Sequence, residues 1–180
     1  LEERGAANDS NVTVTSTLPI MTDNVTFTFG GKSETVQLIV VPDDRTGDLG
    51  DYVRLEDESK EPLSLRDGDV YLSKSSQLVL GIQPGDTAHV QDSSLNVAKV
   101  KVSDISLNYL GNTLYMTQGT YERAFGRSAR LNGVFVLLKG SSADQIAFSK
   151  NLKSDGWLTI SSTAEHWQNY EANFTIINSV

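Results

Sequence analysis

The sequence predicts an α+β fold, with a mixed sheet, packed helices and a strand-rich middle. Three observations support this prediction. Apolar residues alternate with polar ones in short segments, glycine and proline turn signals separate these segments, and capping boxes precede helical patterns near the end of the chain. The 180 residues suit one domain, or one domain with an inserted subdomain.

The first third of the chain predicts strands after a polar lead-in over residues 1–10. Valine and phenylalanine alternate with threonine from Val12 to Thr15 and from Val25 to Phe29, which is the period of a strand. Gly30–Gly31 is a hairpin turn signal, and a strand over Thr35–Val41 follows it. Because this strand is apolar on both faces, we expect it to be covered on both sides.

The middle of the chain predicts a loop and then several short elements. Pro42 ends the preceding strand, and Asp43–Asp51, rich in aspartate and glycine, predicts the loop. Ser73 and Gly81 are expected to cap a short helix at its two ends, and Pro84–Gly85 fits a type II turn. The expected elements are strands at Tyr52–Leu55, Val70–Leu72, Thr87–Val90 and Ala98–Val102, a helix at Lys74–Leu80, and a β-bulge near Ser103–Asp104.

The last third predicts strands alternating with helices. Thr117 is expected to cap a helix that Gly126 ends, and capping boxes begin at Ser142 and Ser162. The expected elements are strands at Leu114–Met116, Val134–Lys139 and Trp157–Ile160, and helices at Thr117–Phe125, at Ser142–Ser154 and from Ser162 onward.

The predicted terminal helix carries an aromatic and apolar stripe. Trp167, Tyr170, Phe174 and Ile177 recur at spacings of three, four and three, which is an a/d seam. Such a stripe most often packs on the domain's own sheet. Because the last residues are apolar and lack a capping glycine or proline, the helix is also expected to continue beyond Val180. Both interpretations can hold together.

Composition excludes several classes of protein. The formal charge of −8 disfavours nucleic acid and anionic lipid head groups as partners. The absence of cysteine excludes disulfides, thiolate zinc sites and a cysteine nucleophile, and favours a cytosolic protein or a bacterial surface protein. No run approaches the roughly 20 apolar residues that span a bilayer.

Catalytic and cofactor motifs are also absent from the sequence. His89 and His166 are the only histidines, and neither a zinc-protease motif, a nucleophile elbow nor a Walker A sequence occurs. Asp43, Asp44, Asp48 and Asp51 could form a calcium loop, but their spacing does not match an EF-hand, so a solvated acidic loop is the preferred interpretation. We expect no catalytic residue, no metal and no cofactor.

Several short passages follow one another in an order that is informative. They are Asp67-Gly68-Asp69-Val70-Tyr71-Leu72-Ser73, Leu80-Gly81-Ile82-Gln83-Pro84-Gly85-Asp86-Thr87, Asn108-Tyr109-Leu110-Gly111 with Leu114-Tyr115-Met116, Tyr121 with Phe125-Gly126, and the strand within Asn132–Leu138. This order resembles that of FtsX/MacB-type permeases of bacterial ABC transporters. The similarity covers roughly residues 36–180, and the order of the pieces carries it more than any single piece.

The resemblance implies an extracytoplasmic domain between two transmembrane helices. It implies a porter-like α+β layer from both chain ends, placed at residues 11–51 and 111–180, with a β-rich subdomain inserted at 52–110. It further implies a dimeric permease in the cell membrane, a separate cytoplasmic ATPase, and a lipid, lipoprotein or peptide substrate outside. The family has no universal catalytic residue in this domain.

The sequence therefore leads to one hypothesis and two alternatives. The hypothesis is a non-catalytic module, extracellular or periplasmic, that binds a substrate or partner and transmits ATP-driven motion through Trp167, Tyr170, Phe174 and Ile177. The alternatives are a free-standing secreted binding or adhesion domain, and a hydrolase built on scattered serine, acidic and histidine residues.

Overall fold

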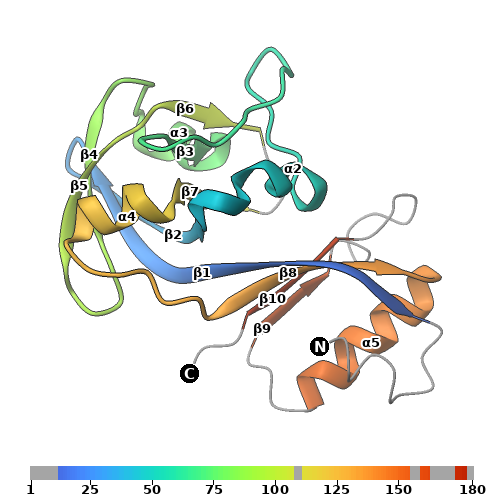
Figure 1. Cartoon of the computed structure of the whole chain (residues 1–180). Helices are drawn as coiled ribbons and strands as arrows, with labels where there is room; N and C mark the ends of the chain where they lie inside the picture. Colours follow the sequence, from blue (N-terminus) through green and yellow to red (C-terminus); the bar gives the residue numbers. More distant parts are fainter. Residues whose placement is uncertain (1–11, 108–110, 155–158, 163–172, 178–180) are drawn as a thin grey trace. The chain divides into compact units, whose positions relative to one another are not determined.

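The computed structural model describes residues 12–107, 111–154, 159–162 and 173–177. The chain divides into two compact units: unit 1 comprises Leu1–Ile20 and Asn132–Val180, and unit 2 comprises Met21–Leu131. One strand, β1 (Thr13–Phe29), contributes its first part to unit 1 and its second part to unit 2 (Figure 1). The predicted insert at residues 52–110 lies within unit 2, whose limits are wider.

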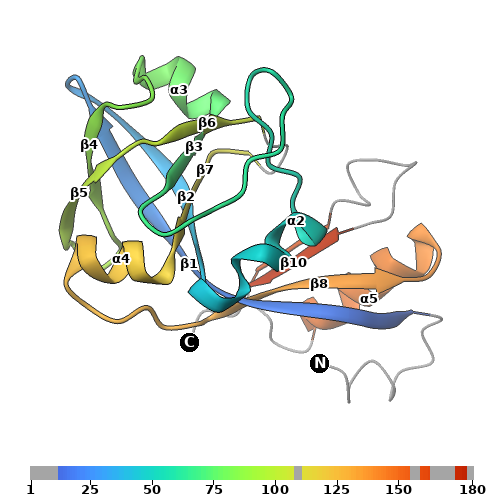
Figure 2. The same cartoon turned by 45° about the horizontal axis from the view of Figure 1, so that its top comes forward.

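Unit 2 is built on a mixed, curled sheet (Figure 2). The strands run in the order β6-β3-β7-β2-β1, and β4 and then β5 follow beyond β1. Pairs β2–β7 and β3–β6 are parallel, and the other pairs are antiparallel. The bounds are β2 Lys32–Val41, β3 Val70–Ser73, β4 Thr87–Gln91, β5 Val97–Lys101, β6 Asp104–Ser106 and β7 Thr113–Thr117. The mixed sheet confirms the predicted fold class.

The main core of unit 2 lies on one face of this sheet. Alternate residues of the strands point into it, among them Phe27, Leu38, Leu72 and Leu114, all without solvent exposure. Two helices close the core: α3 (Lys74–Leu80) contributes Leu80, and α4 (Gln118–Phe125) contributes the fully buried Tyr121. Each buried aliphatic side chain of this kind stabilises the fold by about 1.5–3 kcal/mol.

The other face of the sheet is also covered, as the two-sided apolar pattern of Thr35–Val41 predicted. Ile39 and Val41 alternate with the core residues of β2 and are buried as well. The segment between β2 and β3 supplies further buried side chains, namely Leu49, Tyr52, Val53, Leu55 and Leu65. The Tyr71 hydroxyl, on β3, lies 2.9 Å from the Ser64 carbonyl oxygen of this segment.

Two predictions for the segment between β2 and β3 are wrong. The expected loop over Asp43–Asp51 is a 3₁₀ helix, η1 (Asp43–Asp48), followed by the short helix α2 (Leu49–Tyr52). The expected strand over Tyr52–Leu55 is not formed, because Tyr52 ends α2, and the nearest bridge pairs Glu56 with Pro62. Aspartates next to glycines favour turns, but here they form the first helical turn after Pro42.

Three predicted helix ends and the predicted type II turn are confirmed, whereas Ser73 stands at the N-terminal end of α3 without a side-chain capping hydrogen bond. Gly81 and Gly126 adopt the left-handed conformation at the ends of α3 and α4, with φ of 76° and 67°. The Thr117 side chain accepts a hydrogen bond from the Thr120 amide, as an N-cap should. Gly85 has φ of 95° and Asp86 N donates to Gln83 O over 3.0 Å, as in a type II turn.

The predicted β-bulge near Ser103–Asp104 is wrong. The chain changes partner there: β5 pairs with β4, whereas β6 pairs with β3. Ser103 N donates to Val70 O over 2.8 Å, so this residue already lies along β3. The slip in the apolar pattern after Val102 therefore marks a change of strand and not a bulge within one.

In its described residues, unit 1 has a four-stranded sheet and one helix. Its strand order is β1-β8-β10-β9, all antiparallel, with β8 at Gly133–Lys139, β9 at Thr159–Ser162 and β10 at Asn173–Ile177. The predicted central strand is confirmed, since β8 lies between β1 and β10. The helix α5 (Ser142–Ser154) is confirmed too, but its N-terminal cap is Ser141, whose Oγ accepts from Asp144 N over 3.2 Å.

The predicted terminal helix is wrong over residues 173–177. This stretch is β10, and its register pairs Phe174 with Val136 on β8 and with Ser162 on β9. The sequence Asn173-Phe174-Thr175-Ile176-Ile177 is rich in aromatic and β-branched residues, which favour strands. Only two residues of the predicted helical stripe, Phe174 and Ile177, lie in this stretch. Within the described part of the chain, no helix is long and apolar enough to cross a membrane.

Candidate functional site

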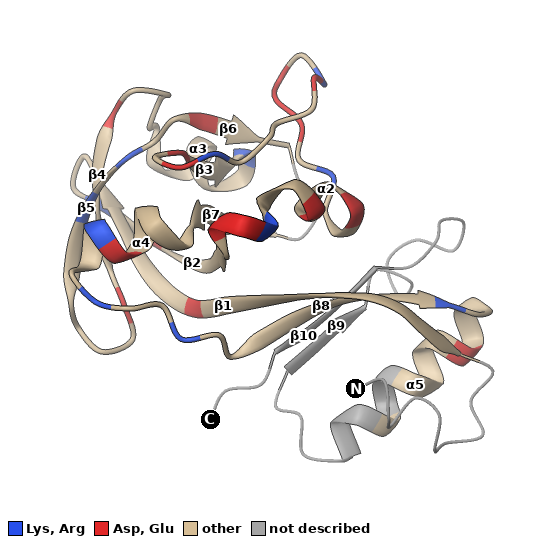
Figure 3. Ribbon diagram, viewed as in Figure 1, with Lys and Arg blue, Asp and Glu red and all other residues tan. Residues whose placement is uncertain are grey.

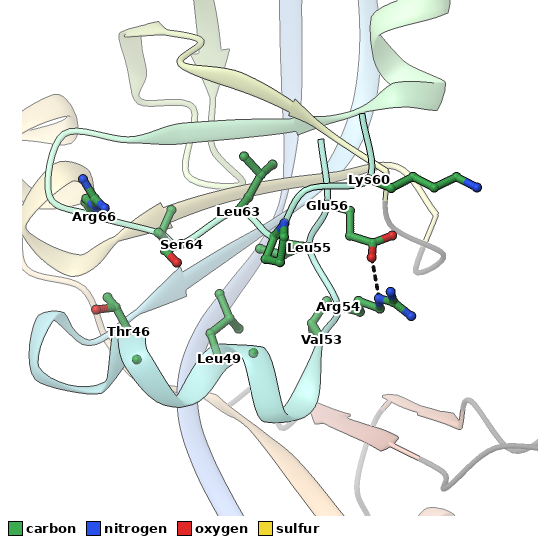
Figure 4. A pocket seen from close by; sticks show the side chains of 14 residues that line it. Thr46, Leu49, Val53, Arg54, Leu55, Glu56, Lys60, Leu63, Ser64 and Arg66 are labelled. Atoms are coloured by element: carbon green, nitrogen blue, oxygen red, sulfur yellow. Dashed lines mark hydrogen bonds and ion pairs between the residues drawn. The ribbon is translucent and has the colours of Figure 1, made fainter. Parts of the chain in front are cut away.

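A groove in unit 2 is the candidate site. It has a volume of about 670 Å³, within the roughly 300–1,000 Å³ range of ligand pockets. Every residue that lines it belongs to one stretch of chain, residues 46–66, between β2 and β3. Figure 4 shows α2 along one side and the segment around Leu63 and Ser64 along the other.

The floor of the groove is apolar and belongs to the fold. Leu49, Val53, Leu55 and Leu65 line the groove and are each at most 5% exposed, so they are held by packing beneath. Leu63 N donates to Leu55 O over 2.9 Å, and this hydrogen bond holds the two sides of the groove together. A ligand would therefore meet a preformed apolar surface and would not have to order it.

A tight turn fixes the rim near Lys60. The Asp57 carboxylate accepts hydrogen bonds from Ser59 N and Glu61 N, at 2.8 and 2.9 Å. Lys60 N donates to Asp57 O over 3.0 Å, and Lys60 has a positive φ of 65°. These bonds offset the backbone strain of a left-handed lysine, which costs about 1 kcal/mol. The lysine backbone is thus held in one conformation.

The charged side chains that line the groove are mostly cationic. They are Arg54, Lys60 and Arg66, against one carboxylate, Glu56, which pairs with Arg54 over 2.6 Å. Within the described residues, no salt bridge involves Lys60 or Arg66. The ribbon around the groove otherwise carries charges of both signs (Figure 3). The lining is therefore locally positive in a chain whose formal charge is −8.

The predicted acidic loop does not gather its carboxylates. Asp43 caps the first turn of α4, where both of its carboxylate oxygens lie 3.1 Å from Gly119 N. Asp48 pairs with Arg45 within η1. In the part of the chain that the structure describes, no group of three or more histidine, cysteine or acidic residues could hold a metal ion. The calcium interpretation of Asp43, Asp44, Asp48 and Asp51 has no support here.

Asp67 ties the turn before β3 to the start of α4. Its carboxylate pairs with Arg123 and lies 3.4 Å from the hydroxyls of Thr117 and Thr120. The hydrogen bond from Arg123 lowers the pKa of Asp67 below its usual 3.8. With Asp43 and Asp67 both at this helix end, the positive pole of the helix is already occupied by carboxylates. This cluster is structural.

Asp92 is a second charged group with a structural role. Its side chain is fully buried, accepts from Ser94 N and Asn96 N, and pairs with Arg127 over 2.7 Å. Arg127 Nε also donates to the hydroxyl of Tyr121, and Tyr121 stacks on Phe125 with ring centroids 4.7 Å apart. The network joins the β4–β5 hairpin to α4, so its polar groups hold the fold together.

None of the sequence-predicted candidates that the structure describes lines the groove. His89 is an exposed residue of β4, opposite Thr28 on β1 and Lys99 on β5. Trp167 and Tyr170, like His166, lie outside the described residues, whereas Phe174 and Ile177 lie on β10. Sequence reasoning missed Lys60 and Arg66. The available signal was the alternation Leu63-Ser64-Leu65-Arg66, which is typical of a half-buried segment.

Comparisons with known proteins identify similar solved structures only. Neither the protein-family models nor the curated proteins give a match. One similar structure is the periplasmic region of MacB from Actinobacillus actinomycetemcomitans, 17% identical over 85% of this chain and 71% of that one, with a TM-score of 0.46. Another is the extracellular domain of the ABC-type transporter YknZ from Gram-positive bacteria, 16% identical over 91% and 81%, with a TM-score of 0.49.

Proposed function

We propose that this chain is the extracytoplasmic domain of an ABC transporter permease, a non-catalytic module that binds a substrate or partner and couples it to ATP-driven motion. The supporting observation is the order of the resembling passages along the fold. The first two passages cover β3, the end of α3 with Gly81, the type II turn and the start of β4. The next two cover β7, then α4 with Gly126, and the last covers β8. The resembling motifs thus lie on strands, helices and turns that follow one another along the chain in the family's order, with β5 and β6 between the second and third motifs.

The route of coupling is part of the proposal. Phe174 and Ile177 belong to a strand that is hydrogen-bonded on both sides, by β8 and β9. We therefore assign transmission to the sheet of unit 1, through the segment that contains Trp167, Tyr170, Phe174 and Ile177, and no longer to a continuous terminal helix. A strand paired along both edges resists bending and extension because its hydrogen bonds must break together.

The site chemistry favours binding over catalysis. The groove has an apolar floor with a few charged groups at its rim, which is the usual composition of a binding pocket. Among the described residues its charged groups do not form a nucleophile–base pair, since Glu56 accepts from Arg54 and His89 does not line the groove. Partners of the proposed module are a cognate cytoplasmic ATPase, a second permease copy and a substrate outside the membrane.

The proposal is tested in the parent transporter, reconstituted with its ATPase in lipid nanodiscs. Residues 13–177 are replaced by a short glycine-serine linker, and ATP hydrolysis is measured with and without substrate-bearing membrane extract. We expect basal hydrolysis to persist and stimulation to disappear. Retained stimulation would refute a coupling role. Turnover of a model ester or peptide by the purified chain, abolished by replacing His89 and His166 together, would instead support the hydrolase.

A further inference from the structure

We propose that the groove over residues 46–66 binds a short peptide segment with an apolar middle and an acidic side chain toward each end. This inference rests on the proposed function, because it names the chemistry of the substrate or partner that the module would hold. It differs from what the net charge suggests, since a chain of charge −8 is expected to attract cationic ligands.

The first argument is the placement of charge along the groove. In Figure 4, Arg66 lies toward one end and Lys60 toward the other, with Leu49 and Leu55 between them. Both cations are exposed, and among the described residues neither has a carboxylate within salt-bridge distance. A linear ligand in this groove therefore meets a positive charge at each end and leucine side chains in the middle.

The second argument is that the nearby carboxylates are engaged or lie outside the groove. Glu56 is 7% exposed and is bound by Arg54. Asp57 accepts the hydrogen bonds of its own turn, and Glu58 pairs with Lys74. Asp51 and Glu61 are exposed but do not line the groove. The lining itself retains the two cations that are not paired, Lys60 and Arg66.

The third argument distinguishes a peptide from a lipid. A fatty acyl chain carries its charge at one end and needs an apolar end for its tail, whereas this groove has a cation toward both ends. The residues that line the groove also include Ser64 and Thr46, whose hydroxyl groups suit a peptide backbone. An extended peptide with glutamates on both sides of aliphatic residues fits this pattern.

The probe is the peptide Glu-Leu-Val-Leu-Glu-amide with carboxyfluorescein on its N-terminal amine, and the control peptide, labelled in the same way, has lysine in place of each glutamate. Fluorescence polarisation with the purified chain should give at least tenfold tighter binding for the acidic peptide. The difference should shrink as salt rises from about 0.05 M to 0.5 M, because exposed charges are screened. Equal binding of the two peptides, or none, would overturn the inference.

Matched variants locate the site. Lys60→Glu with Arg66→Glu should weaken binding of the acidic peptide at least tenfold, whereas Lys99→Glu with Lys101→Glu, an equal charge change on the exposed side of β5, should change it less than twofold. Equal effects of the two double variants would place binding elsewhere. Displacement of the peptide by palmitate at equal concentration would indicate that the groove binds a lipid and would overturn the inference that it binds a peptide.

The outcome is separable from that of the proposed function. The peptide assay uses this chain alone, and the coupling assay uses the reconstituted transporter. Failure of the peptide to bind, with stimulation still dependent on residues 13–177, would remove only the substrate assignment. Peptide binding without any effect of the domain on the transporter would remove the proposed function and leave a binding module.

Discussion

The Asp92 carboxylate is completely buried and pairs over 2.7 Å with Arg127, whose side chain keeps 36% of its surface exposed. The pair fixes the end of the β4–β5 hairpin against α4, because Arg127 also donates to Tyr121 on that helix. An ion pair with one fully buried partner responds strongly to loss of the other partner, since a charge is then left unpaired in the interior.

Arg127→Ala should therefore lower the free energy of unfolding by about 3 kcal/mol. The amides of Ser94 and Asn96 remain bound to Asp92 and limit the loss. Urea denaturation at neutral pH measures the change. Arg130→Ala is the matched control, because Arg130 is exposed and has no salt bridge among the described residues, and it should change stability by less than about 0.5 kcal/mol. Similar values for both variants would contradict the role of the pair.

Gly119 lies where a methyl group has little room. A Cβ atom there would lie 3.1 Å from Asp43 Oδ2 and 3.2 Å from Asp67 Oδ1 and Arg123 Nη1. Replacing glycine with alanine inside a helix normally stabilises it by about 1 kcal/mol. We expect Gly119→Ala to yield no such gain.

Gly50→Ala is the comparison for that variant. Gly50 lies in α2 with no atom within 4 Å of an added Cβ, so the substitution should raise the free energy of unfolding by about 0.5–1 kcal/mol. Thermal denaturation of the two variants side by side decides the matter. A gain in stability for Gly119→Ala equal to that for Gly50→Ala would show that the side chains of Asp43, Asp67 and Arg123 move to admit the methyl group without cost.

The pH dependence of stability should carry the signature of Asp67. Its pKa is lowered in the folded chain by the hydrogen bond from Arg123, so the folded state favours the charged carboxylate. The contribution is complete above the usual value of 3.8 and is lost as pH falls through the lower folded value.

The wild type should exceed Asp67→Asn in melting temperature by a constant amount above about pH 5, and the gap should narrow below about pH 4. Melting curves across this range measure it. A gap that stays constant down to the most acidic sample, or widens, would show that the carboxylate does not respond to Arg123 as described.

The β4–β5 hairpin holds a leucine in the left-handed conformation. Leu95 has φ of 67°, and the residue is 75% exposed, so it gains little burial there. Leu95→Gly should relieve the strain and raise the free energy of unfolding by about 0.5–1 kcal/mol. Val97→Gly, on the neighbouring extended strand, should lower it by a similar amount. If equilibrium unfolding gives Leu95→Gly a lower free energy of unfolding than Val97→Gly, the left-handed conformation of Leu95 is not strained.

Local signals in the sequence predicted most elements of unit 2, because a single glycine or threonine is enough to end a helix, form a turn or cap a helix. Gly81, Gly85 and Gly126 each adopt a positive φ, and Thr117 caps the helical turn that follows it directly. These effects do not depend on distant residues. The partner change after Val102 could not be predicted in this way. It depends on which strand pairs with β6, here β3, and the pattern of apolar residues does not show which strand that is.

The end of the chain shows how a periodic pattern can mislead. Four residues at spacings of three and four suggested a helix, but β-branched residues fill the same stretch around Phe174, and pairing with β8 and β9 decides its structure. The groove was missed for a different reason. Lys60 and Arg66 come together with leucines only because η1, α2 and the loop after them fold back, and these helical turns were expected to be a loop.

The most direct measurement of the central claim is substrate-stimulated ATP hydrolysis by the parent transporter with Gly-Gly-Ser-Gly inserted after Ser179. The same insertion after Gly31, in the exposed β1–β2 turn, is the control. If the domain transmits motion through the sheet that contains β10, the insertion after Ser179 abolishes stimulation and leaves basal hydrolysis intact, while the control retains both. Full stimulation with the insertion after Ser179 would contradict mechanical coupling through this domain.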